Sequence, residues 1–401
     1  MHYAVWRCTP IKKIMQVYLK KNCEKDILQG QCWVYANQVA RILNRQKNGS
    51  LAEVYTFDGK FLGKGYVNFL SKILIRMFVF DTNQDDNADL WRKRIEQADA
   101  FKRSILSDDN YRVVFAEADN LPALIVDRYA DVLVVQFLSL GVDMRKKMIV
   151  DILVDLFNPT CVYERSDVAV RQKEGLQPSV GVLYGALNDE VIITENGLKL
   201  SVDVVNGQKT GYFLDQKFNR QAIRRYCKDK TVLDCFCNCG GFTVNAALSA
   251  KHVTAVDVSQ TALDNVQKNA LLNRFNNVTT LKADVFELLR AYKQQNTKFD
   301  VVILDPPAFT KSADQTQDAV KGYRDINLLG FKLVNAGGYL VTCSCSHYVD
   351  MPLFLRTIRQ AAAASNRRVR LCEIRTQSPD HASLFTSDNT AYLKFLILKV
   401  D

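Results

Sequence analysis

The stretch Val232-Leu233-Asp234-Cys235-Phe236-Cys237-Asn238-Cys239-Gly240-Gly241 sets the fold class of the C-terminal half of this chain. An apolar run leads into a glycine pair, and a helical segment through Ala250 follows. Outward from it, apolar and helical segments alternate: strands are expected at 253–257, 278–281, 300–304 and 390–400, and helices at 260–272, 285–292 and 322–335. Such alternation predicts an α/β domain with a parallel, doubly wound sheet over residues 201–401.

The N-terminal part has a different pattern. Residues 10–80 read as short alternating strands, and Asp58-Gly59 is a strong hairpin signal. The acidic stretch 81–89 suggests a linker, and residues 90–106 have helical spacing with Phe101 on the apolar face. We therefore predict a compact β-barrel over 1–80, a linker and helix over 81–107, and a small α+β domain over 108–200.

Composition and charge narrow the class of protein. The 401 residues are 48% hydrophobic and 24% charged, and no apolar run approaches the roughly 18 residues that span a membrane. The chain shows no export signal, so we expect a cytoplasmic protein with reduced thiols. Of the net charge of +10, the first 80 residues hold +9, which favours a nucleic-acid partner for that unit over a merely solvated face.

Three cysteines, Cys235, Cys237 and Cys239, raise the question of a metal. Zinc sites usually combine two pairs of ligands, or one pair with histidines, and this chain has only 4 histidines. We interpret the run as buried thiols and expect no metal.

Acidic residues follow successive strands, where open α/β sheets bind ligands. Asp234 ends the first strand, Asp257 ends the second 23 residues later, and Asp284 follows the third. That offset is near the roughly 20 residues typical of a ribose-binding carboxylate. The pair Gly240-Gly241 would allow a ligand close to the backbone. Because the G-x-G-x-x-G pattern for a pyrophosphate is absent, S-adenosylmethionine is favoured over NAD.

Four motifs occur in order: VLDCFCNCGGF (232–242), VDVSQTALDNVQKNALLN (256–273), DVVILDPPAF (300–309) and LVTCSCS (340–346). Together they resemble bacterial 23S rRNA (cytosine-5)-methyltransferases of the PUA-domain type. DVVNGQKTGYFLDQ (203–216), the segments 116–129 and 163–176, and parts of 31–71 are similar to the same family. The resemblance implies a PUA-like barrel, a middle domain and a Rossmann-like class I methyltransferase domain. It also implies S-adenosylmethionine as methyl donor and 23S rRNA, or a large-subunit precursor, as partner.

The resemblance also implies roles for particular residues. Gln208, Lys209 and Thr210 would form a wall of the cofactor pocket, and Gly240, Asp257, Asp284 and Asp305 would contact the cofactor or the base. Cys345 would be the nucleophile. The chain departs from the family pattern at Gln31-Cys32 and at Ala382, where the family usually has His-Pro and Pro. The first departure bears on RNA contacts, and neither involves the thiol.

The chemistry of these residue types suits cytosine. Carbon 5 is a poor nucleophile until a thiolate adds to carbon 6, so Cys345 would need a lowered pKa. Asp305 would bind or protonate ring nitrogen 3, and Arg165 and Arg171 are candidates for the RNA path. Two alternatives stay open: methylation of another base position on the same fold, and a catalytically silent RNA-binding protein of ribosome assembly. The oligomeric state also stays open, with a homodimer as one option.

Overall fold

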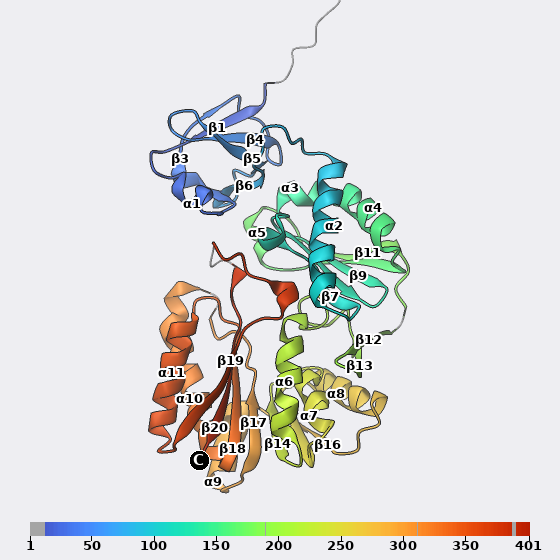
Figure 1. The fold of residues 1–401 in the computed structure, drawn as a ribbon, viewed down its shortest axis with the longest axis vertical. Helices are drawn as coiled ribbons and strands as arrows, with labels where there is room; N and C mark the ends of the chain where they lie inside the picture. The colour runs from blue at the N-terminus through green and yellow to red at the C-terminus, as the bar shows by residue number, and fades with distance from the viewer. Residues whose placement is uncertain (1–12, 189, 311, 387–389) are drawn as a thin grey trace, which may run out of the picture.

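The computed structural model describes residues 13–188, 190–310, 312–386 and 390–401, and three units follow one another along the chain (Figure 1). The start of the predicted barrel, residues 1–12 with Arg7 and Lys12, lies outside the described residues. In the part of the chain that is described, no helix is long and apolar enough to cross a membrane.

The N-terminal unit is one mixed sheet of six strands in the order β2-β6-β5-β4-β1-β3. Alternate residues of β1, Met15, Val17 and Leu19, are fully buried in its core because successive side chains of a strand point to opposite faces. The expected hairpin is present: Gly59 has φ +90° and joins the antiparallel strands β4 and β5. The elements are β1 (Met15–Leu19), α1 (Lys25–Leu28), β2 (Trp33–Tyr35), β3 (Val39–Leu43), β4 (Leu51–Tyr55), β5 (Phe61–Val67) and β6 (Ile73–Val79).

The middle unit packs the long helix α2 against a sheet of five strands in the order β11-β10-β9-β8-β7. The elements are α2 (Ala88–Ile105), β7 (Asn110–Phe115), β8 (Leu124–Tyr129), β9 (Val132–Phe137), α3 (Leu140–Asp143), α4 (Lys146–Phe157), β10 (Cys161–Ser166), α5 (Val170–Lys173) and β11 (Ser179–Gly185). A separate hairpin of β12 (Val191–Glu195) and β13 (Leu198–Val202) leads into the last unit.

The C-terminal unit is a sheet of seven strands in the order β16-β15-β14-β17-β18-β20-β19, with helices on both faces (Figure 1). The strands are β14 (Thr231–Cys235), β15 (His252–Asp257), β16 (Val278–Lys282), β17 (Phe299–Leu304), β18 (Val334–Ser344), β19 (Val369–Arg375) and β20 (Lys394–Val400). The helices are α6 (Lys217–Cys227), α7 (Gly241–Ala247), α8 (Gln260–Leu272), α9 (Val285–Gln294), α10 (Thr316–Leu333) and α11 (Met351–Ala364).

The sheet is not wholly parallel, which corrects the sequence-based expectation. The pairs β14–β15, β14–β17, β15–β16 and β17–β18 are parallel, whereas β20 is antiparallel to both of its neighbours, β18 and β19. Strand β20 lies between β18 and β19 in the sheet, so an apolar run alone could not reveal its direction. All the strands that reach the acidic residues are parallel, and their carboxyl ends therefore share one edge.

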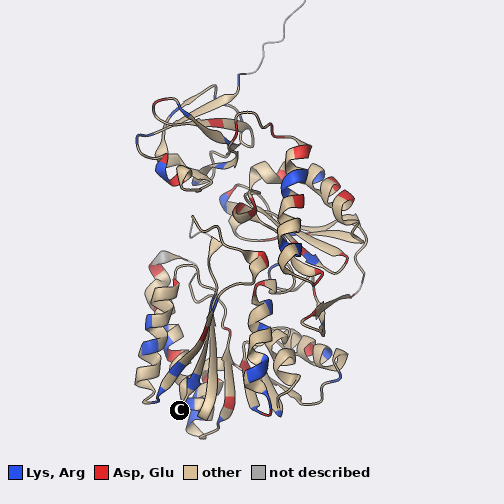
Figure 2. Cartoon of the chain, in the orientation of Figure 1, with Lys and Arg blue, Asp and Glu red and all other residues tan. Residues whose placement is uncertain are grey.

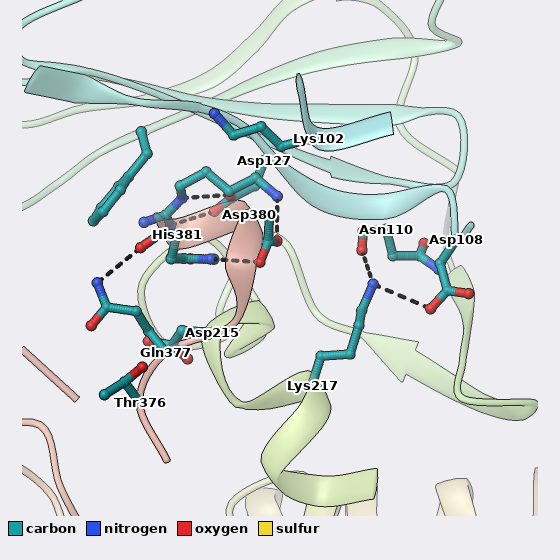
Figure 3. A network of polar contacts seen from close by, with 12 residues as sticks. Lys102, Asp108, Asn110, Asp127, Asp215, Lys217, Thr376, Gln377, Asp380 and His381 are labelled. Atoms are coloured by element: carbon teal, nitrogen blue, oxygen red, sulfur yellow. Dashed lines mark hydrogen bonds and ion pairs between the residues drawn. The ribbon is translucent and has the colours of Figure 1, made fainter. Parts of the chain in front are cut away.

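Buried polar contacts join the units. Glu174 of the middle unit accepts from Asn68, Ser71 and Arg76 of the N-terminal unit, at 3.0, 2.7 and 3.2 Å. Asp380 of the C-terminal unit accepts from the backbone N–H of Arg112 at 2.9 Å, and Arg112 forms a bidentate pair with Asp127 at 2.8 Å (Figure 3). Separating the units would leave buried charged groups without their partners, which is energetically unfavourable. These contacts therefore fix how the units are placed.

Candidate active site

A cavity of about 220 Å³ opens at the carboxyl ends of β14, β15, β17 and β18. Parallel strands bring their ends to one edge of the sheet, so segments far apart in sequence meet there. Its walls come from the turn after β14, from the ends of the other three strands and from the segment before α6. The lining residues are Gln208, Lys209, Tyr212, Phe213, Asp215, Gln216, Arg220, Phe236, Cys237, Asn238, Cys239, Gly241, Phe242, Asp257, Val258, Asp305, Pro306, Pro307, Cys345 and Leu393.

The turn between β14 and α7 brings main chain to the cavity. Phe236, Asn238 and Gly240 all have positive φ, at 60°, 50° and 86°, so the chain reverses sharply before the helix. Asp257 holds the turn, since its carboxylate accepts from the backbone N–H of Asn238 at 3.0 Å. A Cβ at Gly241 would lie 2.8 Å from Cδ of Arg220, so a side chain there would force that arginine to move.

Arg220 is a buried residue of the cavity wall, and the spacing of sequence motifs did not point to it. Its guanidinium binds both carboxylate oxygens of Glu195 at 2.7 Å and lies over the ring of Tyr212, 4.4 Å from the centroid. Glu195 ends strand β12, outside the sheet that carries the acidic motifs. The pair fixes this wall by contacts that no local pattern of the sequence reveals.

Asp305 follows β17 and is held by an amide. Gln216 donates from Nε2 to both oxygens of Asp305 at 3.3 and 3.2 Å, and Asn219 donates to Oε1 of Gln216 at 2.7 Å. Burial, together with the nearby charge of Asp215, raises the pKa of Asp305 to about 6. The carboxyl group can therefore exchange a proton close to neutral pH.

The two cysteines of the Thr342–Ser346 run have different surroundings. Cys343 lies inside β18 and is fully buried, whereas the strand ends at Ser344 and the half-buried Cys345 lines the cavity. Nζ of Lys394 donates to the carbonyl oxygens of Ser346 and Tyr392, both at 2.7 Å, and so fixes the turn that carries Cys345. His347, two residues beyond the thiol, is exposed.

The expected lowering of the thiol's pKa is absent from this structure. Burial raises the pKa of Cys345 above its ordinary value, and the carboxylates of Asp305 and Asp215 act in the same direction. The ammonium groups of Lys209 and Lys394 oppose the shift. Burial also lowers the pKa of Lys394 to about 8, so this lysine carries its charge over much of the physiological range.

Asp215 is a second buried carboxylate in the cavity wall, and no spacing rule points to it. Its side chain is 4% exposed, and its Oδ2 accepts from Tyr392 Oη at 2.5 Å and from Lys209 Nζ at 3.2 Å. The segment that holds it, 203–216, was recognised through the family resemblance. Only the fold shows that Asp215 and Lys209 form an ion pair beside Asp305.

The remaining expected site residues do not line the cavity. Thr210 is buried and donates to Asp127 at 2.6 Å, and Asp234 is buried beneath the turn and accepts from Thr243 at 2.6 Å. Gly240 is the residue just before α7, and the exposed Asp284 caps α9 by accepting from the N–H of Glu287 at 3.0 Å. Gln208, Lys209, Gly241, Asp257, Asp305 and Cys345 all line the cavity.

In the part of the chain that the structure describes, no group of three or more His, Cys, Asp or Glu residues is placed to hold a metal ion. Cys235 and Cys237 are buried, and burial raises the pKa of both thiols.

Known families and proteins match this architecture. Residues 17–80 match a family model described as a PUA-like domain, and residues 169–398 match one described as an S-adenosylmethionine-dependent methyltransferase. A ribosomal RNA large subunit methyltransferase I from Vibrio vulnificus is 42% identical over 393 residues, which cover 96% of this chain and 99% of that protein. One from Aeromonas hydrophila is 41% identical over 391 residues, covering 96% and 98%.

The chain belongs to the ribosomal RNA large subunit methyltransferase I family.

Solved structures show the same fold for this family member. A protein from Streptococcus mutans described as a SAM-dependent methyltransferase superposes with a TM-score of 0.82 at 20% identity, covering 97% of this chain and all of that one. A methyltransferase complexed with SAH superposes with a TM-score of 0.83 at the same identity and coverage. The predicted PUA-like unit and Rossmann-like methyltransferase sheet are thus confirmed, while the exact domain limits stay predictions.

The methyl donor of the family is S-adenosylmethionine, and the cavity is suited to it. Its floor offers the carboxylate of Asp257 at the end of β15, where α/β sheets bind ribose hydroxyls. Gly241 leaves room at the start of α7 that a side chain would fill. Lys209, Asp215 and Asp305 line the part of the cavity whose charges act on the Cys345 thiol.

Proposed function

We propose that this enzyme transfers a methyl group from S-adenosylmethionine to carbon 5 of a cytosine in large-subunit (23S) rRNA, with Cys345 as the nucleophile. One observation carries the proposal: a thiol, a proton-exchanging carboxyl group and the ribose-type carboxylate share one cavity, in Cys345, Asp305 and Asp257. The relatives' name, ribosomal RNA large subunit methyltransferase I, supplies the class of RNA.

The proposed reaction uses Cys345 and Asp305 in sequence. The thiolate of Cys345 forms a bond to carbon 6 of the ring, and carbon 5 gains the electron density that lets it take the methyl group. Asp305 hydrogen-bonds or protonates ring nitrogen 3, which offsets the charge that builds during addition. S-adenosylmethionine supplies the methyl group as an electrophile and leaves as S-adenosylhomocysteine when its sulfur–methyl bond breaks. Transfer of the carbon 5 proton to a base then restores the double bond between carbons 5 and 6 and expels the thiolate of Cys345.

The geometry favours Cys345 over Cys343 for this role. Cys343 is enclosed in the sheet, and burial raises the pKa of its thiol well above the ordinary value. Cys345 faces the cavity beyond the end of β18, with Lys209 and Lys394 close enough to favour its thiolate. An enclosed thiol cannot reach a base, whereas one at a strand end can meet a nucleotide that has been flipped out or is unpaired.

The N-terminal unit offers a surface for RNA. Its exposed cations lie over aromatic rings: Arg41 is 4.1 Å from the ring centroid of Tyr18, and Lys21 is 5.1 Å from that of Phe57. Tyr18 also stacks on Tyr55 at 5.2 Å between centroids. Cations beside aromatic faces suit both the phosphates and the unstacked bases of RNA.

The test combines mapping with a covalent trap. Mass spectrometry of rRNA from a strain that lacks the gene, before and after methylation by the purified protein, identifies the target nucleotide. A short RNA with 5-fluorocytosine at that position should be methylated once and then held on the enzyme, because fluorine cannot leave as a proton does. Peptide mapping should place the adduct on Cys345.

Matched variants decide between the cysteines and between reaction classes. Cys345→Ser should abolish the adduct and turnover while cofactor still binds, and Cys343→Ser should remain active. Full turnover by Cys345→Ser would instead indicate methylation of a purine or an exocyclic amine on the same fold, which needs no thiol. A protein that binds no S-adenosylmethionine in a titration would be the silent assembly factor.

A further inference from the structure

One oxygen of a carboxylate that lines the cavity with Cys345 has no partner in the part of the chain that the structure describes. Oδ1 of Asp215 is buried and makes no hydrogen bond among the described residues, although Oδ2 of the same group accepts two. A buried acceptor without a partner is costly, and more so when it carries a charge. Asp215 lines the cavity, so a bound molecule can supply the missing donor.

The charge state of Asp215 is fixed by its neighbours. Burial alone would raise its pKa, but the Lys209 ammonium, His381 and the Tyr392 hydroxyl bond together hold it well below the usual value. Asp305, in the same cavity, is shifted the opposite way, mainly by burial. When the surroundings of two neighbouring carboxyl groups shift their pKa values in opposite directions, the two groups commonly have different roles in the reaction. Asp215 is a permanent acceptor, and Asp305 is a group that can donate.

Asp215 lies at the nucleophile's end of the cavity. The charges that act most on the pKa of Cys345 include those of Asp215, Asp305 and Lys209 and do not include that of Asp257. Gln216, the next residue along the chain, donates to Asp305 at 3.3 and 3.2 Å, and Asp215 lines the same cavity as Asp305 and Cys345, so Asp215 stands beside the groups that would act on the base.

We propose that Oδ1 of Asp215 accepts a hydrogen bond from the exocyclic 4-amino group of the target base, and that this contact selects cytosine over uracil. The inference rests on the proposed function, since it concerns the base that Cys345 attacks. Cytosine presents an amino donor at position 4 and an acceptor at nitrogen 3, so it complements an acceptor in Asp215 and a donor in Asp305. Uracil presents an acceptor at position 4, and its O4 would face the carboxylate of Asp215 with no proton between them.

The Asp215→Asn variant tests the proposal directly, because the neighbours of residue 215 determine which way the asparagine amide is oriented. In the wild type, Oδ2 faces the ammonium of Lys209 and the hydroxyl of Tyr392. The amide oxygen of asparagine will take that side, since an NH₂ group facing Lys209 would be repelled. The NH₂ group then occupies the place of Oδ1 and donates where the wild type accepts. The variant should thus tolerate the O4 atom of uracil.

The experiment uses the full chain and short RNAs that span the mapped target with cytidine, uridine or pyrimidin-2-one at that position. Total methyl incorporation from radiolabelled S-adenosylmethionine gives kcat/KM for each base, regardless of which atom is methylated. We expect the wild type to prefer cytidine over uridine by at least about 100-fold. Asp215→Asn should reduce that preference by about 100-fold, with the dissociation constant for S-adenosylmethionine unchanged. Tyr392→Phe, which removes a bond from Oδ2 only, should keep the wild-type preference.

A second measurement changes the RNA base and leaves Asp215 intact, so its result does not depend on whether the Asp215→Asn variant folds. In a Cys345→Ser background, RNA with pyrimidin-2-one, which lacks the amino group, should bind about tenfold more weakly than RNA with cytidine. Equal binding would overturn the proposal. So would an Asp215→Asn variant that keeps the cytidine preference but loses cofactor affinity, because Asp215 would then hold the donor's ammonium. Product identified as methylated elsewhere than carbon 5 would refute the proposed function, while the base preference would still test Asp215.

Discussion

The carboxylate of Asp257 both holds the turn after β14 and lines the cavity. Its two oxygens accept from the N–H groups of Asn238 and Ser259, both at 3.0 Å, and the same carboxylate lines the cavity. Carboxylate oxygens have further lone pairs, so ribose hydroxyls can bind there as well. The position matches the strand-end spacing from which a ribose contact was predicted.

We expect Asp257→Ala to raise the dissociation constant for S-adenosylmethionine about ten- to a hundredfold, because a charge-assisted hydrogen bond contributes roughly 1.5–3 kcal/mol. Isothermal titration measures the constant. Thermal unfolding of the same variant shows whether the turn has loosened. An unchanged constant would remove Asp257 from the cofactor site.

Asp234 gives a pH-dependent prediction. It is 1% exposed, its Oδ1 has no partner among the described residues, and burial raises its pKa to about 7. An unfolded chain has an aspartate pKa of about 3.9, so the folded state binds this proton more tightly. The resulting stability is complete below about pH 4 and is lost as the pH rises towards 7.

The variant Asp234→Asn stays neutral at every pH and keeps an acceptor for Thr243. Relative to the wild type it should therefore become more stable as the pH rises from 5 to 8, by about 2–3 kcal/mol. Thermal unfolding midpoints of both proteins across this range provide the measurement. Parallel pH profiles would show that Asp234 does not titrate in this window.

At the scale of elements, the ends of strands and helices decide which residues face the site. Strand β18 ends between Cys343 and Cys345, so one thiol stays in the sheet and the other meets the cavity. Helix α2 shows the limit of periodicity: the buried residues include Trp91, Ile95 and Lys102, while Phe101 is 44% exposed. The spacing was helical as predicted, but Lys102 replaces the expected Phe101 because Asp119 pairs with its ammonium.

Asp284 is the N-cap residue of α9, and its Oδ1 accepts from the N–H of Glu287. We expect Asp284→Ala to lower the free energy of unfolding by about 1 kcal/mol and Asp284→Asn to leave it nearly unchanged, because asparagine caps as well as aspartate does. Denaturant titration gives both values. Equal losses in the two variants would mean that the charge, rather than the cap, matters; a cofactor titration of the pair also tests the contact to adenine expected from the family resemblance.

At the scale of the whole molecule, some lysines and arginines are buried in ion pairs or hydrogen bonds, whereas others lie on the surface. Arg76 belongs to the basic N-terminal unit but is buried between Glu117 and Glu174, with nitrogen–oxygen distances of 3.3 and 3.2 Å. Arg165 and Arg171, the two candidates for the RNA path, are 6% and 3% exposed and bind backbone carbonyls, so burial removes them from that role. Figure 2 shows other Lys and Arg residues along α6 and α11 of the C-terminal unit.

This division determines how the RNA surface should be tested. Removing the N-terminal unit would take away Arg76, the ion-pair partner of Glu174, and expose the surface between the units, so charge reversal of exposed residues is the cleaner change. We expect Lys21→Glu with Arg41→Glu to weaken RNA binding and to reduce the slope of log K against log salt by about 0.7–0.9 for each phosphate that is no longer neutralised. Affinity for S-adenosylmethionine should not change. A slope equal to that of the wild type would mean that this charge is only a solvated face.

Local patterns in the amino-acid sequence were enough to predict the three-part order, the strands and helices around the acidic motifs, and the hairpin at Gly59. These features depend on periodicity and turn chemistry, which a linear pattern records. Strand-end spacing indicated Asp257, because strand ends in an α/β sheet converge on one edge, and the family resemblance indicated Asp305 and Cys345. Asp284 shows the limit of this strand-end rule: it follows a strand as predicted, but the cavity does not reach it.

Which charges meet depends instead on long-range packing. The pairing of Asp215 with Lys209 and Tyr392 joins residues up to 177 positions apart, and the antiparallel direction of β20 depends on its neighbours in the sheet. The raised pKa values of Asp305 and Cys345 follow from burial, which is a property of the packed molecule. A sequence specifies which groups are available, but desolvation and proximity arise when the chain closes around them.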